Sequence, residues 1–62
     1  MNWRRARARE YVTDTGYRIR RDTHLRQWTA WDPEGFAFAR TRTLREAKEQ
    51  AEWWERRGRV QD

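Results

Sequence analysis

The sequence predicts an α+β fold in which a three-stranded antiparallel sheet carries one C-terminal helix packed on one face. Two patterns predict it. Between positions 17 and 41, apolar and polar residues alternate in short runs separated by turn residues, as in half-buried strands. After position 43, apolar residues recur at helical spacing. A chain of 62 residues, 35% of them hydrophobic, has enough apolar side chains for one small core.

The first two strands follow from alternation. After the turn residues Asp14-Thr15-Gly16, the run Tyr17-Arg18-Ile19-Arg20-Arg21 places Tyr17 and Ile19 on one face and the first two arginines on the other. The next run, residues 26–31, is rich in strand-forming side chains. Because the connections are short, we expect an antiparallel meander, to which residues 11–13 could add a fourth short strand.

A turn separates the second strand from the third. In Asp32-Pro33-Glu34-Gly35, Asp at the first position, Pro at the second and Gly at the fourth specify a type I turn. The third strand, residues 36–41, has two orientations open to it. Either Phe36 and Phe38 face the helix and Ala37 and Ala39 lie on the opposite face, or the reverse. We favour the phenylalanines facing the helix, because so small a core needs their area.

The helix has a start signal and an end signal. Thr43-Leu44-Arg45-Glu46 is a capping box with Thr43 as N-cap. The helix is then expected to run to about Arg57, and Gly58 is placed to end it. The predicted buried face consists of Leu44, Ala47, Ala51 and Trp54. Trp53 falls nearly opposite, so its helix position predicts exposure unless the N-terminal segment or Val60 covers it. Of these alternatives we favour cover by the N-terminal segment; an exposed Trp53 would mark a second protein-binding surface.

The chain divides into a basic N-terminal arm over residues 1–10, a single domain over 11–58 and a C-terminal tail over 59–62. The arm alternates Arg and Ala, which suits a helix, a strand or a disordered segment. We expect a loosely ordered arm, with Trp3 tucked onto the domain.

The sequence gives little support for an active site, a metal site or a membrane-spanning segment. The chain has no cysteine and one histidine, His24, so no catalytic residue, metal site or cofactor is predicted. No glycine-rich loop or other feature points to a small-molecule substrate. No apolar run is long enough to cross a bilayer, and none follows Met1 as in a signal peptide. We therefore expect a non-enzymatic cytoplasmic protein, either in a bacterial host or associated with its nucleoid.

The charge points to an anionic partner. The formal net charge is +5, and 14 of the 15 basic residues are Arg. Codon bias in a GC-rich genome accounts for the choice of Arg over Lys, but not for the net charge or its placement. Positive charge is concentrated in the arm and strands, whereas the helix is nearly neutral. If Tyr17 and Ile19 face the helix, the other face of the sheet presents Arg18, Arg20, Gln27, Thr29 and Trp31. Such side chains contact phosphates and base edges.

Several short motifs carry a family resemblance. They are Tyr17-Arg18, Arg20, Trp28-Thr29-Ala30, Asp32-Pro33-Glu34-Gly35 and Thr43-Leu44-Arg45-Glu46-Ala47. Together they resemble the DNA-binding domain of plant ethylene-response factors and the N-terminal arm-binding domain of phage-type tyrosine integrases. The resemblance covers residues 17–54 and implies a sheet laid in the major groove. It also implies that Arg18, Arg20 and Arg26 contact bases or phosphates and that Arg40 contributes from the third strand. Ala37 and Ala39 depart from those families, which carry larger groups there.

DNA is therefore the predicted partner, with RNA as an option if residues 2–10 are helical. The predicted nucleic-acid-binding residues are Arg4, Arg5, Arg7, Arg18, Arg20, Arg26, Gln27, Thr29, Trp31, Arg40 and Arg42. The alternative is a phage-encoded interaction protein that binds and modulates a host protein through Trp31 or Trp53, since small stand-alone modules of this kind are common among phages of GC-rich hosts.

Overall fold

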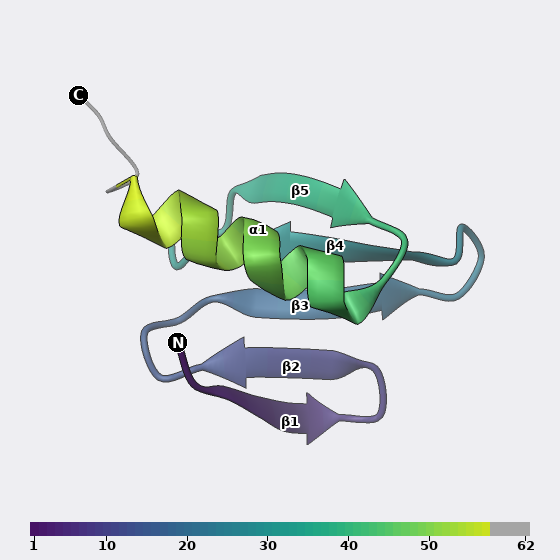
Figure 1. Cartoon of the computed structure of the whole chain (residues 1–62). Helices are drawn as coiled ribbons and strands as arrows, with labels where there is room; N and C mark the ends of the chain where they lie inside the picture. The colour runs from purple at the N-terminus through teal and green to yellow at the C-terminus, as the bar shows by residue number, and fades with distance from the viewer. Residues whose placement is uncertain (58–62) are drawn as a thin grey trace.

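Five antiparallel strands form one sheet, and a single helix lies across it (Figure 1). The computed structural model describes residues 1–57. The elements, in chain order, are β1 (Trp3–Arg7), β2 (Glu10–Thr13), β3 (Arg18–Asp22), β4 (Gln27–Trp31), β5 (Ala37–Thr41) and α1 (Leu44–Arg56). Each strand pairs with its neighbour in sequence. The expected α+β meander with one C-terminal helix is confirmed, with five strands instead of three or four.

The N-terminal segment is a strand and not a loosely ordered arm. Trp3 is paired with Thr13, and Arg5 with Tyr11, in the β1–β2 ladder. Trp3 packs against the core, as expected, and this contact holds β1 in the sheet. The expected helix end at Gly58, the tail over 59–62 and a covering role for Val60 lie outside the described residues.

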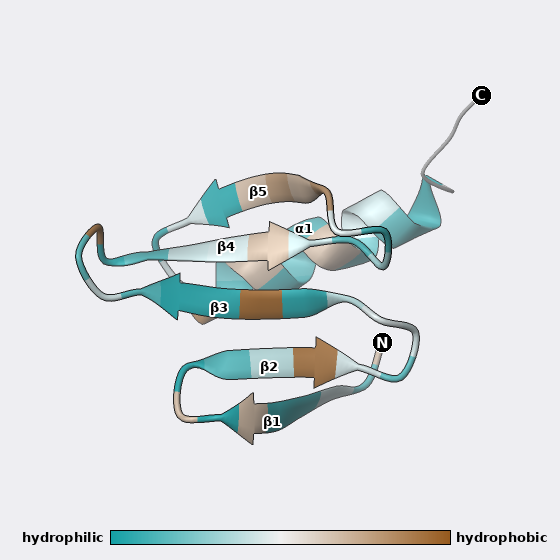
Figure 2. Ribbon diagram, turned by 180° about the vertical axis from the view of Figure 1, so that it is seen from behind, coloured by the Kyte–Doolittle hydropathy of each residue, from teal (hydrophilic) through white to brown (hydrophobic). Residues whose placement is uncertain are grey.

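The core lies between α1 and one face of the sheet. Tyr17, Ile19 and Ala30 from the sheet side and Ala47 and Ala51 from the helix are fully buried. The two helical alanines have short side chains, so the helix backbone can approach the sheet closely. The helix packs over β3, β4 and β5, and its backbone does not reach β1 or β2. Among the described residues, no helix lies on the opposite face of the sheet (Figure 2).

A bulge decides the orientation of β5. Trp31 is paired with Ala37 and Ala30 with Ala39, so the register shifts and Phe38 is the extra residue. Phe38 stacks on Trp54 of the helix at 5.0 Å between ring centroids. Phe38 therefore faces the helix as favoured, and Ala37 lies on the opposite face. Ala39, expected on that opposite face, instead shares the helix side with buried Ala30, because the bulge breaks strict alternation.

Local hydrogen bonds build the predicted turn and helix start. The buried Asp32 carboxylate accepts hydrogen bonds from the backbone N–H groups of Glu34 and Phe36, both at 2.9 Å. Its carbonyl accepts from the Gly35 N–H at 2.9 Å, which closes the turn. At the helix start, the Thr43 hydroxyl accepts from the Glu46 N–H at 3.1 Å.

Candidate nucleic-acid interface

The sheet face opposite α1 brings together most of the predicted binding residues, and we call it the open face. Cross-strand pairing aligns its side chains in rows. One row holds Arg4, Val12, Arg18, Trp31 and Ala37, the next holds Glu10, Arg20, Thr29 and Arg40, and a third holds Asp22 and Gln27. Arg7, paired with Glu10 beyond a register shift, extends the second row. Five arginines thus share this face with two carboxylates.

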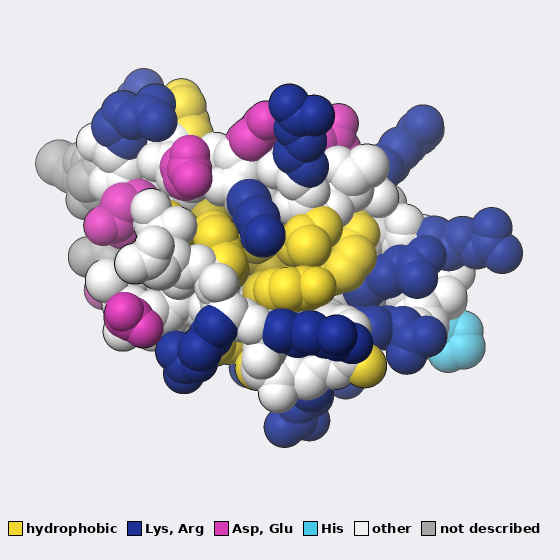
Figure 3. All heavy atoms as spheres, turned by 60° about the horizontal axis from the view of Figure 1, so that its bottom comes forward, with side chains coloured by type: hydrophobic (Ala, Val, Ile, Leu, Met, Phe, Trp, Pro, Cys, Tyr) yellow, Lys and Arg dark blue, Asp and Glu magenta, His cyan; other side chains and the backbone are white. Residues whose placement is uncertain are grey.

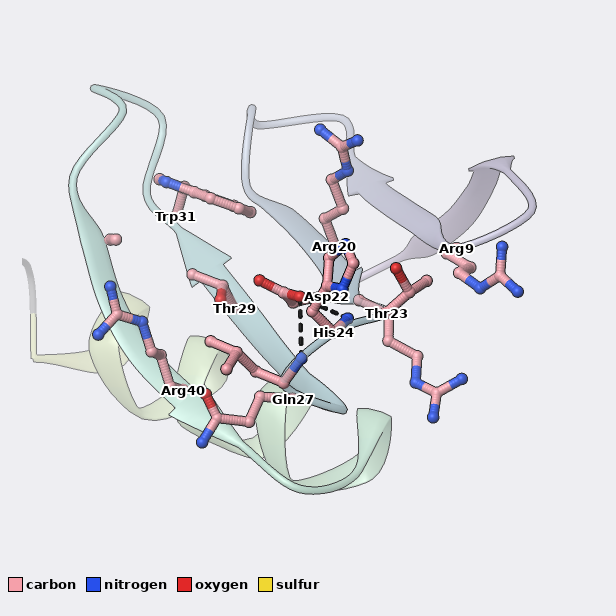
Figure 4. Close-up of a pocket in the computed structure, with 12 residues that line it drawn as sticks. Arg9, Arg20, Asp22, Thr23, His24, Gln27, Thr29, Trp31 and Arg40 are labelled. Carbon is pink, nitrogen blue, oxygen red and sulfur yellow. Dashed lines mark hydrogen bonds between the residues drawn. The ribbon is translucent and has the colours of Figure 1, made fainter.

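Arg20 and Arg40 are the cations best placed for an external anion. They flank Thr29 on the three neighbouring strands β3, β4 and β5. Adjacent strands lie about 4.8 Å apart, so their backbones are separated by about 10 Å. Within residues 1–57, neither guanidinium forms an ion pair. Both line a hollow of about 720 Å³, together with Thr29 and Trp31 (Figure 4).

Trp31 is held by its neighbour across the strands. The Arg18 guanidinium carbon lies 4.7 Å from the centroid of the Trp31 ring, in the range of a cation–π contact. The tryptophan is half-buried, whereas Arg18 is exposed. The contact gives Trp31 a role in cross-strand packing, and it leaves the donors of Arg18 on the surface.

Glu10 is the feature of this face that the sequence analysis missed. Its side chain is 14% exposed and lies 3.4 Å from the Arg7 guanidinium and 3.9 Å from that of Arg18. It therefore orients two of the arginines and lowers the local positive charge. The short strand considered over residues 11–13 begins one residue too late to include Glu10, which is the first residue of β2.

Asp22 organises the loop at one end of the open face. Its carboxylate accepts hydrogen bonds from the backbone N–H groups of His24, at 2.8 Å, and Leu25, at 3.1 Å. The bonds from Leu25 and His24 lower the pKa of Asp22, because they stabilise the charged form. The nearby charge of Arg20 lowers this pKa further, so Asp22 also offsets part of the positive charge of the open face.

Four predicted residues lie away from the open face. Arg5 is paired with Tyr11 and lies on the helix side of the sheet. Arg26 lies in the β3–β4 loop with a positive φ of 55°, and Arg42 lies between β5 and α1. Trp53 is 47% exposed, and the Arg57 guanidinium carbon lies 4.8 Å from the centroid of its ring. Trp53 is therefore exposed, and the favoured alternative, in which the N-terminal segment covers it, is wrong.

Within residues 1–57, no group of three or more His, Cys, Asp or Glu side chains is arranged to hold a metal ion. The part of the chain that the structure describes has no helix both long and apolar enough to cross a bilayer.

Comparison of the chain with protein-family models, curated proteins and solved structures finds no match in any of the three. The resemblance to ethylene-response factors and integrase arm-binding domains therefore stays a prediction.

Proposed function

We propose that this chain is a non-enzymatic DNA-binding accessory or regulatory protein that lays its open face on duplex DNA. It acts in the cytoplasm, on bacterial or phage DNA. The observation that carries the proposal is the pair Arg20 and Arg40, which flank Thr29 and form no ion pair within residues 1–57. Guanidinium groups bind phosphates and guanine edges in a bidentate manner.

Two further features favour a duplex over a single strand. The open face is a sheet surface whose exposed functional groups are mainly hydrogen-bond donors. Its one tryptophan, Trp31, is half-buried against Arg18, so it offers little free ring surface for stacking. Donors reach phosphates and base edges in a groove, whereas single strands are bound largely by stacking.

The test measures duplex affinity across a salt series. We expect the logarithm of the association constant to fall linearly with the logarithm of salt concentration. In the double variant Arg20→Ala/Arg40→Ala, the slope should shrink by about 1.8, because each phosphate contact contributes about 0.9. Fluorescence anisotropy of a short labelled duplex provides the measurement.

Arg45→Ala is the matched control. Arg45 is exposed on the helix, 3.5 Å from Glu49, away from the open face, so its removal should leave the slope unchanged. Equal slopes for the wild type and the double variant would contradict the proposal.

The alternative function, docking onto a host protein, is favoured by a separate observation. Phe36 is 59% exposed and stacks on Trp54, with 5.8 Å between the ring centroids. Trp53, which precedes Trp54 in the helix, is also exposed. Aromatic side chains in such positions are frequent anchors of protein interfaces. An association of this kind would respond little to salt, so the same salt series separates the two functions.

A further inference from the structure

The helix leaves part of its own side of the sheet uncovered. The α1 backbone packs over β3–β5 and does not reach the β1–β2 hairpin. Aromatic and basic side chains gather on the hairpin and on the adjoining parts of β3, β4 and α1, and we call this area the hairpin surface. Its residues are Trp3, Arg5, Tyr11, Arg21, Trp28 and Lys48. Figure 3 shows hydrophobic side chains exposed in a patch bordered by Lys and Arg.

Two aromatic rings form the centre of the hairpin surface. The centroids of Tyr11 and Trp28 lie 6.3 Å apart, with an angle of 53° between the ring planes. Both residues are only partly buried, although Trp28 also packs against the core. The structure thus exposes aromatic area beside the helix.

Three cations surround these rings. Arg5 is the cross-strand partner of Tyr11 and Arg21 that of Trp28, and the Lys48 Nζ lies 5.2 Å from the centroid of the Tyr11 ring. In the described part of the chain, none of the three forms an ion pair. By contrast, four other arginines have carboxylate partners. Aromatic area bordered by unneutralised cations is complementary to a ligand that combines planar rings with negative charge.

We propose that the hairpin surface binds single-stranded nucleic acid, separately from the open face. Bases stack on Tyr11 and the exposed part of Trp28, and Arg5, Arg21 and Lys48 contact the backbone phosphates. Lys48 has a flexible stem, so its ammonium group can leave the Tyr11 ring for a phosphate while a base takes its place. A duplex is excluded because its bases are already stacked on one another, whereas an unpaired strand presents free base faces.

The experiment isolates this surface in the Arg20→Ala/Arg40→Ala background, where the open face contributes least. The probes are a labelled oligothymidine and an abasic strand of equal length, which carries the phosphates without the bases. Tyr11→Leu keeps apolar volume in the sheet and removes the aromatic ring. We expect it to weaken oligothymidine binding by about five-fold or more, since stacking contributes about 1–3 kcal/mol per base, and to leave abasic binding unchanged.

A second variant tests the cations. Arg5→Ala/Lys48→Ala should reduce the salt slope for oligothymidine by about 1.4, because each contact to a single strand contributes about 0.7. Arg45→Ala is again the control, and circular dichroism verifies that each variant is folded. Equal binding of the oligothymidine and the abasic strand would overturn the proposal. Displacement of oligothymidine by an acidic peptide in a Tyr11-independent manner would also overturn it.

The two proposals fail separately. If duplex binding is absent but oligothymidine binding depends on Tyr11 and Lys48, the proposed function is wrong and the hairpin surface stands. If duplex binding depends on Arg20 and Arg40 but Tyr11→Leu has no effect on the single strand, the hairpin surface is wrong and the proposed function stands.

Discussion

Gly16 has the backbone position least tolerant of a side chain. Its φ is +103°, a conformation that residues with a Cβ rarely adopt. A Cβ added there would also lie 3.2 Å from the Cβ of Pro33. Gly35 has a similar φ of +90°, but no atom lies within 4 Å of the corresponding Cβ position. Substitutions at the two glycines therefore distinguish the cost of an unfavourable φ from the cost of steric crowding.

We expect Gly16→Ala to lower the free energy of unfolding by about 2–3 kcal/mol and Gly35→Ala by about 1–2 kcal/mol. Both variants suffer the unfavourable φ, and the first also pushes against Pro33. Urea denaturation of the two variants beside the wild type measures the difference. Equal losses would mean that Pro33 moves aside freely and that only the backbone conformation matters.

At the scale of single residues, the alternation of apolar and polar side chains predicted which face of the sheet most residues of β3 and β4 occupy. It assigned Arg18, Arg20, Thr29 and Trp31 to the open face correctly, because β3 and β4 are regular. It assigned Ala39 incorrectly, because the bulge in β5 inserts Phe38 between two register pairs. A bulge depends on how the strand fits its neighbour and the helix above it, which the local pattern does not contain.

At the scale of elements, the N-terminal strand differs most from expectation. Strand β1 contains three arginines and one alanine, and Trp3 is its only residue that is not exposed. Its alternation of Arg and Ala suits a helix and a disordered segment as well as a strand, so the pattern did not distinguish a strand from an arm. The helix and the Asp32 turn were predicted correctly because their signals are local: the Thr43 cap and the Asp-Pro-x-Gly order.

The packing of Trp3 provides a test of β1. Trp3→Ala should lower the free energy of unfolding by about 2–3 kcal/mol, since a partly buried tryptophan contributes less than the 3–5 kcal/mol of a fully buried one. Trp53→Ala is the control, because the same substitution at an exposed helix position should change stability by no more than about 0.5 kcal/mol. Thermal or urea unfolding gives both values. A Trp3→Ala variant as stable as Trp53→Ala would show that β1 is not held on the core.

At the scale of the whole molecule, one helix on a five-stranded sheet divides the surface into three regions. The open face carries five arginines and two carboxylates, the hairpin surface combines aromatic rings with cations that form no ion pair within residues 1–57, and the outer side of α1 bears exposed Trp53. The first region followed from the expectation that a lone helix covers one side of a sheet. The second was missed because it depends on β1, which was not expected to be a strand.

Chemical-shift mapping with duplex DNA at two salt concentrations tests the central claim most directly. Binding through the open face predicts that backbone amide signals of β3, β4 and β5 shift on addition of the duplex, foremost those of Arg20, Thr29 and Arg40. These shifts should diminish steeply at the higher salt concentration, while the signals of α1 stay in place. Shifts confined to α1 around Trp53 and insensitive to salt would contradict the claim.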